Sequence, residues 1–442
     1  MGHRERVYAM PTRRGGSLAA AGPLSSRRQK NSSVHRDPNR PPRTPLRATE
    51  VRKRLESLAL ALVLAAQAPR SPKFPRRTLL AALRNLLKAA ASTGTLTSSR
   101  STSTRGPSRR QLSRVTETLD QGRLQRKITW TLRAQVRPWI PSTPVDVAID
   151  FHLVPYAGDP HRTEQILASK AKQGTNRFHG YSTVAIVQGD RRLTFGLRAV
   201  RSPGHLLSVV RRHLKDAQQL GLKVRWLLLD REFYCGEVIE FLRASGLHAV
   251  MPVRAGSKMR ARWEKGRRSF ALLHTMQSKA GAVSFRVQVV KRYKKGRRGE
   301  HGVESLFYVV IGPRLPPAKL RALYRGRLGI EATFRIAESA RARTTSRRPV
   351  YRLLLMALAI LVENEWIILQ LMHATERCRG RKGYRLREEL LRFEHLLTLL
   401  LTGLRFALGE ILEVRSAGPP PKFVQRMLGG TRGTSRRITT NY

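Results

Sequence analysis

Three acidic side chains stand out in a basic chain, and their settings suit a divalent metal ion. Asp150 ends the segment Val-Asp-Val-Ala-Ile-Asp, Asp230 ends Trp-Leu-Leu-Leu-Asp, and Glu331 lies within Gly-Ile-Glu-Ala-Thr-Phe. A carboxylate is costly to bury unless its charge is cancelled, and Mg²⁺ or Mn²⁺ prefers oxygen ligands. Acids that end apolar strands therefore indicate a metal site of the kind that supports phosphoryl transfer.

The charge of the chain indicates the kind of partner. The 442 residues include 85 Lys and Arg against 29 Asp and Glu, a formal net charge of +56. So many cations bind polyanions through their phosphates and steer the encounter with them. A solvated cationic surface or a membrane-surface patch is the alternative, but no basic amphipathic segment dominates the chain. We therefore expect a nucleic acid, double-stranded DNA, as the partner.

Cysteine content and hydropathy indicate the compartment. Cys235 and Cys378 are too few for a disulfide framework and lack the spacing of a zinc site. No apolar signal segment precedes the first helical pattern, so we expect a cytoplasmic protein. The most apolar stretch, residues 353–372, carries Glu363 and Glu365 near its centre. Because charged groups are costly at bilayer depth, this stretch is expected to be a buried helix, with no membrane contact.

Composition shifts divide the chain. The ends are rich in Arg and poor in regularly spaced apolar residues, so they are expected to be disordered or to contact DNA as flexible arms. Helical spacing dominates before and after a central part that alternates strands and helices. The expected parts are a basic arm at 1–49, a helical DNA-binding region at 50–140, a catalytic domain at 141–350, a helical region at 351–414 and a basic tail at 415–442.

The central part predicts an α/β fold with a defined strand order. Strands are expected at 145–154, 181–188, 191–200, 224–229 and 247–253, with helices at 206–220 and 238–242 between the last three. Helical crossovers imply parallel neighbours, whereas the first three strands form a meander. This order matches the ribonuclease-H-like fold, in which the first and fourth strands are adjacent. Asp150 and Asp230 would then meet.

Asp146 is the main rival to Asp150 as the first ligand. Residues two apart on a strand share a face, so Asp146 and Asp150 point the same way. We rank Asp150 first. His152, His161 and His179 lie nearby in sequence, but no two have a firm metal-ligand spacing, and we assign them no metal role.

A β-rich insertion is expected at 254–316, with strands at 283–290 and 305–311 around a basic loop. Lys294 and Arg297 in that loop are candidate DNA contacts. Trp263 lies among arginines and could stack on an unpaired base, or pack in a core. The helix that follows starts near Pro317.

This helix carries an aromatic residue, a cation and an acid on one face. Tyr324, Arg327 and Glu331 are spaced at i, i+3 and i+7, which places them in a row. One face would therefore present a metal ligand, a phosphate-binding cation and an aromatic ring.

These residues resemble the DDE transposases of prokaryotic insertion sequences, in the group with a β-rich insertion before the third acid. The resemblance covers roughly residues 145–350. It rests on the Asp150 strand, the segment Asp-Arg-Glu-Phe-Tyr that starts at Asp230, and the pattern Tyr-x2-Arg-x3-Glu that ends at Glu331. The family pattern continues with Lys seven residues later, where this chain has Glu338. Arg335 or Arg341 would then take the basic role.

The resemblance implies a cut-and-join enzyme with two Mg²⁺ or Mn²⁺ ions per active site. Asp150 and Asp230 would hold the ions, Glu331 would complete the site, and Tyr324 with Arg327 would position a phosphate. The expected partners are terminal inverted repeats and target DNA, the expected assembly is a homodimer, and the expected location is the nucleoid. The alternatives are a metal-dependent nuclease of the same fold and a non-catalytic DNA-binding protein derived from a transposase.

Overall fold

The computed structural model describes most of the chain between residues 46 and 409. The described ranges are 8–9, 46–67, 74–92, 114–159, 161, 165–172, 174–188, 191–200, 202, 206–278, 281–295, 301–377 and 384–409. They divide into two compact units. We call residues 234–321, with residues 8–9, the insertion unit, and the rest the core unit. The basic arm and tail predicted at the two ends lie almost wholly outside the described residues.

The core unit contains the first four of the five strands that the sequence predicts for a ribonuclease-H-like fold. Its strands are β2 (Val145–Pro155), β3 (Leu167–Lys172), β4 (Thr175–Gln188), β5 (Arg191–Val200) and β6 (Val224–Leu229). β4 pairs antiparallel with β2, β3 and β5, whereas β6 pairs parallel with β2. The first and fourth predicted strands are thus neighbours, as expected. β3 is an additional strand, and residues 189–190 of the predicted hairpin turn lie outside the described residues.

The crossover between β5 and β6 is the helix α5 (Leu206–Gln219). Its apolar residues recur at helical spacing, and Val210 and Ala217 are buried. Gly221 follows with φ of +74°, the left-handed conformation that ends helices and favours glycine. β6 is buried from Trp226 to its end, as expected for a strand covered on both faces.

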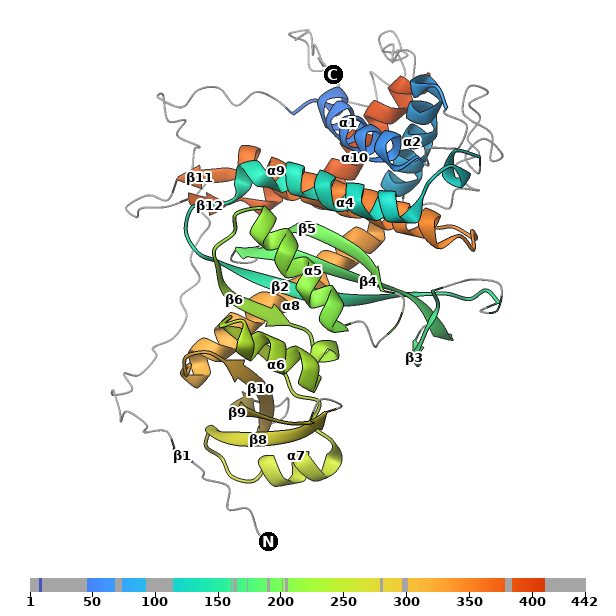
Figure 1. Cartoon of the computed structure of the whole chain (residues 1–442). Helices are drawn as coiled ribbons and strands as arrows, with labels where there is room; N and C mark the ends of the chain where they lie inside the picture. Colours follow the sequence, from blue (N-terminus) through green and yellow to red (C-terminus); the bar gives the residue numbers. More distant parts are fainter. Residues whose placement is uncertain are drawn as a thin grey trace, which may run out of the picture. The chain divides into compact units, whose positions relative to one another are not determined.

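Helices cover β5 and form a bundle. They are α1 (Ala48–Ala66), α2 (Arg76–Ala91), α4 (Gln121–Val136), α9 (Pro349–His373) and α10 (Phe393–Ala407). α4 and α9 lie across β5, and α1 packs against α2, α4 and α10 (Figure 1). Within the helical region predicted at 50–140, α4 begins after Asp120, whose carboxylate accepts a hydrogen bond from the backbone N–H of Arg123. Short elements complete the unit: the 3₁₀ turns Arg137–Trp139, Arg231–Phe233 and Glu388–Leu390 and the hairpin of β11 (Thr375–Arg377) and β12 (Tyr384–Leu386).

α9 is the one helix among the described residues that is long and apolar enough to cross a membrane. It is instead packed inside the core unit, as predicted. Its polar centre is buried: Glu363, Asn364 and Glu365 are each no more than 1% exposed. Asn364 bonds the backbone of Thr194 on β5, and Glu365 pairs with Arg54 of α1. Partners within the fold therefore satisfy Asn364 and Glu365.

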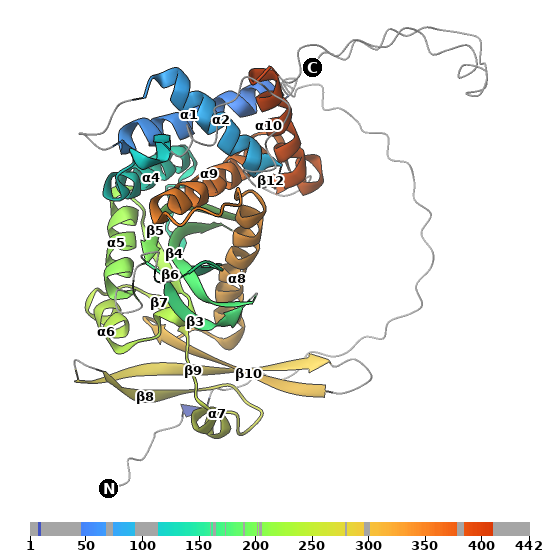
Figure 2. The same ribbon diagram turned by 90° about the vertical axis from the view of Figure 1, so that its right-hand side faces the viewer.

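The helix α8 (Pro317–Ser339) enters the core unit at Ala322. Figure 2 shows the sheet of the core unit between α5 on one side and α8 on the other. Because side chains alternate along a strand, successive residues of β2 face α8 and α5 in turn.

The insertion unit is β-rich, as predicted. It holds α6 (Gly236–Ala244), β7 (Ala249–Pro252), α7 (Ser257–Trp263), β8 (Phe270–Ser278), β9 (Gly281–Lys295) and β10 (His301–Ile311). The strands pair antiparallel in the order β8, β9, β10, β7, and β1 (Tyr8–Ala9) pairs with β8. The sequence predicts β9 and β10 with shorter bounds and misses β8, whose apolar residues Ala271 to Leu273 are consecutive and do not alternate.

Candidate active site

Asp150 and Asp230 lie next to each other in the core unit, Asp150 at the middle of β2 and Asp230 directly after β6. β2 and β6 run parallel, and their last paired residues are Ile149 and Leu229. The next residue on each strand is an aspartate, Asp150 on β2 and Asp230 at the end of β6. The apolar residues that build the two strands thus deliver both carboxylates to one edge of the sheet.

One guanidinium nitrogen bridges the two carboxylates. Nη2 of Arg327 on α8 lies 2.6 Å from Oδ1 of Asp150 and 2.9 Å from Oδ1 of Asp230. Arg327 is only 4% exposed, and its Nε has no hydrogen-bond partner. Two oxygen atoms from different strands therefore converge on a single cationic atom.

The negative charge of Asp150 and Asp230 exceeds the positive charge of Arg327. Burial raises the pKa of Asp150, the negative charge of Asp230 adds to that rise, and Arg327 opposes it. Two carboxylates share one guanidinium, so the group is net negative when both are ionised. Convergent carboxylate oxygens with excess negative charge fit a hard divalent cation.

Tyr324 anchors α8 to the end of β6. Its hydroxyl donates a hydrogen bond to the carbonyl of Leu229 at 3.2 Å, and its side chain is buried. The Cζ atom of Arg327 lies 5.5 Å from the centre of the Tyr324 ring, a cation–π contact. The first two residues of the predicted row on α8, Tyr324 and Arg327, are therefore neighbours. The Tyr324 ring faces the protein interior.

Glu331 lies on α8 one turn after Arg327, at i+4. The backbone position is thus on the face that carries Arg327. The side chain of Glu331 is outside the described part of the structure. Among the side chains that are described, no group of three or more His, Cys, Asp or Glu residues is arranged to hold a metal ion.

Glu338 occupies the position where the resembled family carries Lys. It accepts a hydrogen bond from His152 of β2 at 3.1 Å and is held by Arg341 at 2.8 Å. Burial raises the pKa of Glu338, but the hydrogen bonds from His152 and Arg341 outweigh burial and bring it to about 2. Glu338 is therefore an ionised partner for the Arg341 guanidinium and the His152 ring.

Asp146, the rival to Asp150, has a different partner. Its carboxylate pairs with Arg225 at 2.6 and 2.8 Å, and the Arg225 side chain is 59% exposed. Asp146 thus forms a two-membered ion pair near the start of the strand.

The remaining residues predicted to contact DNA differ in their exposure and in their place in the chain. Arg335 is exposed on α8, at i+4 from Glu331. Trp263 is 3% exposed in the insertion unit, where its ring contacts His274 and Phe307, an arrangement that favours the packing alternative. Lys294 lies on β9 opposite Gly302, with its side chain outside the described residues, and Arg297 lies outside them altogether.

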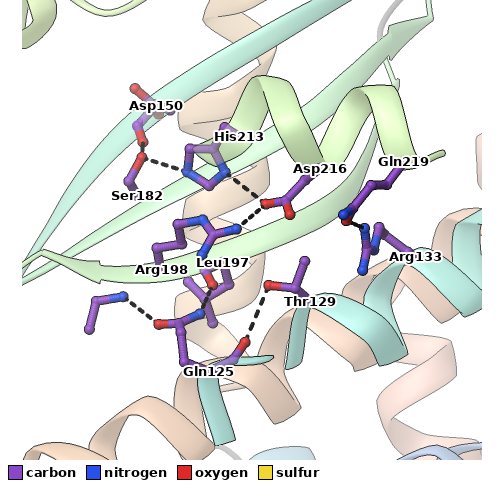
Figure 3. Close-up of polar contacts among 11 residues, drawn as sticks. Gln125, Thr129, Arg133, Asp150, Ser182, Leu197, Arg198, His213, Asp216 and Gln219 are labelled. Carbon is purple, nitrogen blue, oxygen red and sulfur yellow. Dashed lines mark hydrogen bonds and ion pairs between the residues drawn. The ribbon is translucent and has the colours of Figure 1, made fainter. Parts of the chain in front are cut away.

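Sequence analysis missed a polar network behind Asp150. Ser182 of β4 and His213 of α5 lie between the backbone of Asp150 and the carboxylate of Asp216 (Figure 3). Only one signal was available: His213 and Asp216 are spaced at i, i+3 on a predicted helix, whereas nothing in the sequence marks Ser182.

Comparison with known proteins identifies the family. No curated protein matches the chain. A cryo-EM structure of the piggyBac transposase synaptic complex with hairpin DNA is similar over 89% of this chain and 86% of that chain, with a TM-score of 0.46 and 14% identity. The family described as "Transposase DDE domain" matches residues 141–362, half of the 442 residues. The chain therefore belongs to the DDE transposases, enzymes that act on DNA and use divalent metal ions to cleave it and transfer its strands.

Proposed function

We propose that this transposase cuts and joins DNA at the ends of its own element with Asp150, Asp230 and Glu331 as its metal-binding acids. The observation that carries the proposal is the convergence of Asp150 and Asp230 on one nitrogen of Arg327. Two acids from separate strands share one cation there, and no other pair of aspartates in the described residues does so. Glu331 joins the set from the adjoining turn of α8.

The proposed cofactor is a pair of Mg²⁺ or Mn²⁺ ions. Such a pair activates a water or a 3′-hydroxyl for in-line attack and stabilises the leaving oxygen. Asp150 and Asp230 would hold the ions through the oxygens that now face Arg327, and Glu331 would add a carboxylate from α8. Burial favours the protonated form of Asp150, so a neighbouring positive charge is needed to keep it ionised.

Arg327 is proposed to neutralise the two acids first and to bind a DNA phosphate afterwards. Its guanidinium has five N–H donors in a planar fork, which suits both carboxylate and phosphate. In the present structure one nitrogen is committed to both aspartates. Once other positive charge satisfies the acids, Arg327 becomes a donor to a phosphate oxygen. Tyr324 fixes α8 against β6 and thereby sets the reach of Arg327.

The proposed substrate is double-stranded DNA, both the terminal inverted repeats and the target. The net charge of +56 supports strong, salt-dependent binding to phosphates. Arg335, Lys294 and Arg297 are proposed phosphate contacts outside the acid cluster, and residues 50–140 are proposed to bind the element ends. Two ends need two active sites, so we propose a homodimer that acts on the nucleoid in the cytoplasm.

The test is a cleavage and joining assay on DNA that carries both ends of the element. The full chain is incubated with this DNA and Mg²⁺ or Mn²⁺, and nicked and joined products are resolved on a gel. We expect both products from the wild type and neither from Glu331→Gln. Nicking without joining would identify a nuclease instead, and DNA binding without nicking would identify a non-catalytic DNA-binding protein.

A further inference from the structure

The polar network behind Asp150 lies on the opposite face of the sheet from the acid cluster. Ser182 on β4 is the direct partner of Phe151 on β2, and residues directly opposite each other share a face. Successive residues alternate, so Ser182 faces α5 whereas the Asp150 carboxylate faces α8. Only the backbone of Asp150 is accessible from the α5 side.

Ser182 reaches that backbone. Its hydroxyl lies 3.1 Å from the carbonyl oxygen of Asp150 and 3.1 Å from Nε2 of His213 (Figure 3). Both side chains are fully buried, at 0% exposure. Because an unsatisfied buried polar group is costly, these contacts are the means by which the hydroxyl and the ring nitrogen are stabilised.

Counting protons gives the direction of the chain of hydrogen bonds. The carbonyl oxygen of Asp150 can only accept, so Ser182 gives its one hydroxyl proton to that carbonyl, and its contact with Nε2 of His213 is a hydrogen bond only if Nε2 carries a proton. Nδ1 has no hydrogen-bond partner and lies 3.7 Å from Oδ2 of Asp216, beyond hydrogen-bond distance. With the proton on Nε2, His213 donates to Ser182, and Ser182 donates its own proton to the Asp150 carbonyl. This arrangement satisfies every contact within 3.5 Å.

The end of the network at Asp216 is held by contacts between α5 and β5. Arg198 of β5 donates to Asp216 at 2.5 Å, which ties α5 to the sheet. Gly196 lets α5 approach: a Cβ at that position would lie 2.7 Å from a methyl group of Val184 and 3.3 Å from Nδ1 of His213. The His213 ring is therefore held close to the strands by a glycine and an ion pair.

A serine that contacts a histidine, which in turn lies near an aspartate, is also the arrangement of a hydrolase triad. The geometry argues against that role. Ser182 has no exposed surface from which to attack a substrate. Its proton is directed to a carbonyl, not to a base. The hydroxyl is therefore suited to holding a backbone group and not to nucleophilic attack.

We propose that Ser182 and His213 are positioning residues that hold Asp150 from behind, so that its carboxylate is presented to the metal in a fixed orientation. Hydrogen bonds beyond the ligands orient the groups that bind a metal, and their loss weakens metal affinity. The proposal rests on the proposed function, because it assumes that Asp150 is a metal ligand.

The test measures Mn²⁺ binding by the full chain directly, from the loss of the electron paramagnetic resonance signal of free Mn²⁺. We expect Ser182→Ala to raise the dissociation constant about 10-fold, the effect usual for a group one shell beyond the ligands. His213→Leu, which cannot donate, should weaken Mn²⁺ binding in the same way, whereas His213→Gln, which can donate, should restore most of it.

Thr129→Val is the matched control. Thr129 is a buried residue of α4 whose hydroxyl donates to the Gln125 carbonyl at 3.2 Å, away from Asp150. Its variant should lose thermal stability as Ser182→Ala does and keep wild-type Mn²⁺ affinity. The proposal is overturned if Ser182→Ala and His213→Leu bind Mn²⁺ as the wild type does, or if the Gln and Leu variants of His213 are equally impaired.

A further variant separates this proposal from the one on which it rests. If Asp150→Asn binds Mn²⁺ as tightly as the wild type, the proposed metal site itself fails. If Asp150→Asn loses Mn²⁺ binding while Ser182→Ala and His213→Leu retain it, only the positioning role fails.

Discussion

Two aspartates on one face of β2 have different surroundings, Asp146 near the start of the strand and Asp150 at its middle. Asp146 and Asp150 share one face of the strand, both are buried, and each pairs with an arginine. The partner of Asp146, Arg225, is 59% exposed and binds that acid alone. The partner of Asp150, Arg327, is 4% exposed and also binds Asp230.

This difference shows what distinguishes a metal site from an ion pair. A partly exposed pair with matched charges contributes about 0–1 kcal/mol and requires nothing further. Two acids that share one buried cation leave an excess of negative charge in a place with little water. The number of acids that share one cation, and not the presence of an acid on a strand, therefore distinguishes Asp150 from Asp146.

The largest expected effect is on catalysis. Asp150→Asn and Asp230→Asn should each lower the rate of metal-dependent DNA nicking by more than about 100-fold, the upper range for groups beyond the ligands. Asp146→Asn should nick DNA at nearly the wild-type rate, apart from any loss that its lower stability causes. Rates measured at saturating DNA check this, and equal losses from Asp146→Asn and Asp150→Asn would remove the distinction between the two aspartates.

The next effect is on the stability of the metal-free protein. Arg327→Gln leaves two carboxylates without their shared cation, so we expect the free energy of unfolding to fall by about 3 kcal/mol. Arg225→Gln should cost about 1 kcal/mol or less, because that pair is exposed. Denaturation in the presence of a chelator measures both. Mn²⁺ should then raise the Tm of Arg327→Gln more than that of the wild type, since no guanidinium competes for the acids; equal shifts would contradict this.

A smaller effect is expected from Tyr324→Phe. It removes the hydrogen bond to the Leu229 carbonyl and should lower the free energy of unfolding by about 1 kcal/mol. Because the ring stays in contact with Arg327, DNA binding should change little. Denaturation and a DNA-binding titration check both points. A large loss of DNA affinity at unchanged stability would show that Tyr324 contacts DNA directly, as the sequence suggests.

The smallest effect concerns pH and a third pair on β2, His152 with Glu338. The folded pKa of Glu338, about 2, lies below the ordinary value of 4.5. Its ionised form therefore contributes stability above about pH 4.5, and this contribution is lost as pH falls toward about 2. Solvent screening of the partly exposed group limits it to about 1 kcal/mol or less. Glu338→Gln should be less stable than the wild type at pH 7, with the gap closing in acid; a gap independent of pH would be contrary to this.

Much of the fold could be predicted from local pattern. The helical period of α5 with Gly221 after it, and the continuous apolar run of β6, specify elements whose order permits few topologies. That order predicts that Asp150 and Asp230 are adjacent without any knowledge of side chains. The polar centre of α9 similarly predicts a helix packed inside the protein.

The rest depends on contacts between distant residues. The sequence does not show that Arg327 turns inward to two aspartates more than ninety residues away, or that Tyr324 bonds a strand carbonyl. Ser182 and His213 lie on elements that only the sheet brings together. β8 was missed because its apolar residues are consecutive, and tertiary packing determines which of them are buried.

The most direct test of the central claim maps the metal site on the chain itself. Fe²⁺ is bound in place of Mg²⁺ to the full-length protein, and ascorbate with peroxide then generates radicals that cleave the backbone near the ion. We expect cuts near residues 150, 230 and 331 that excess Mg²⁺ suppresses and that Asp150→Asn removes, whereas Asp146→Asn retains them. Cuts elsewhere, or cuts near residue 146 that survive in Asp150→Asn, would contradict it.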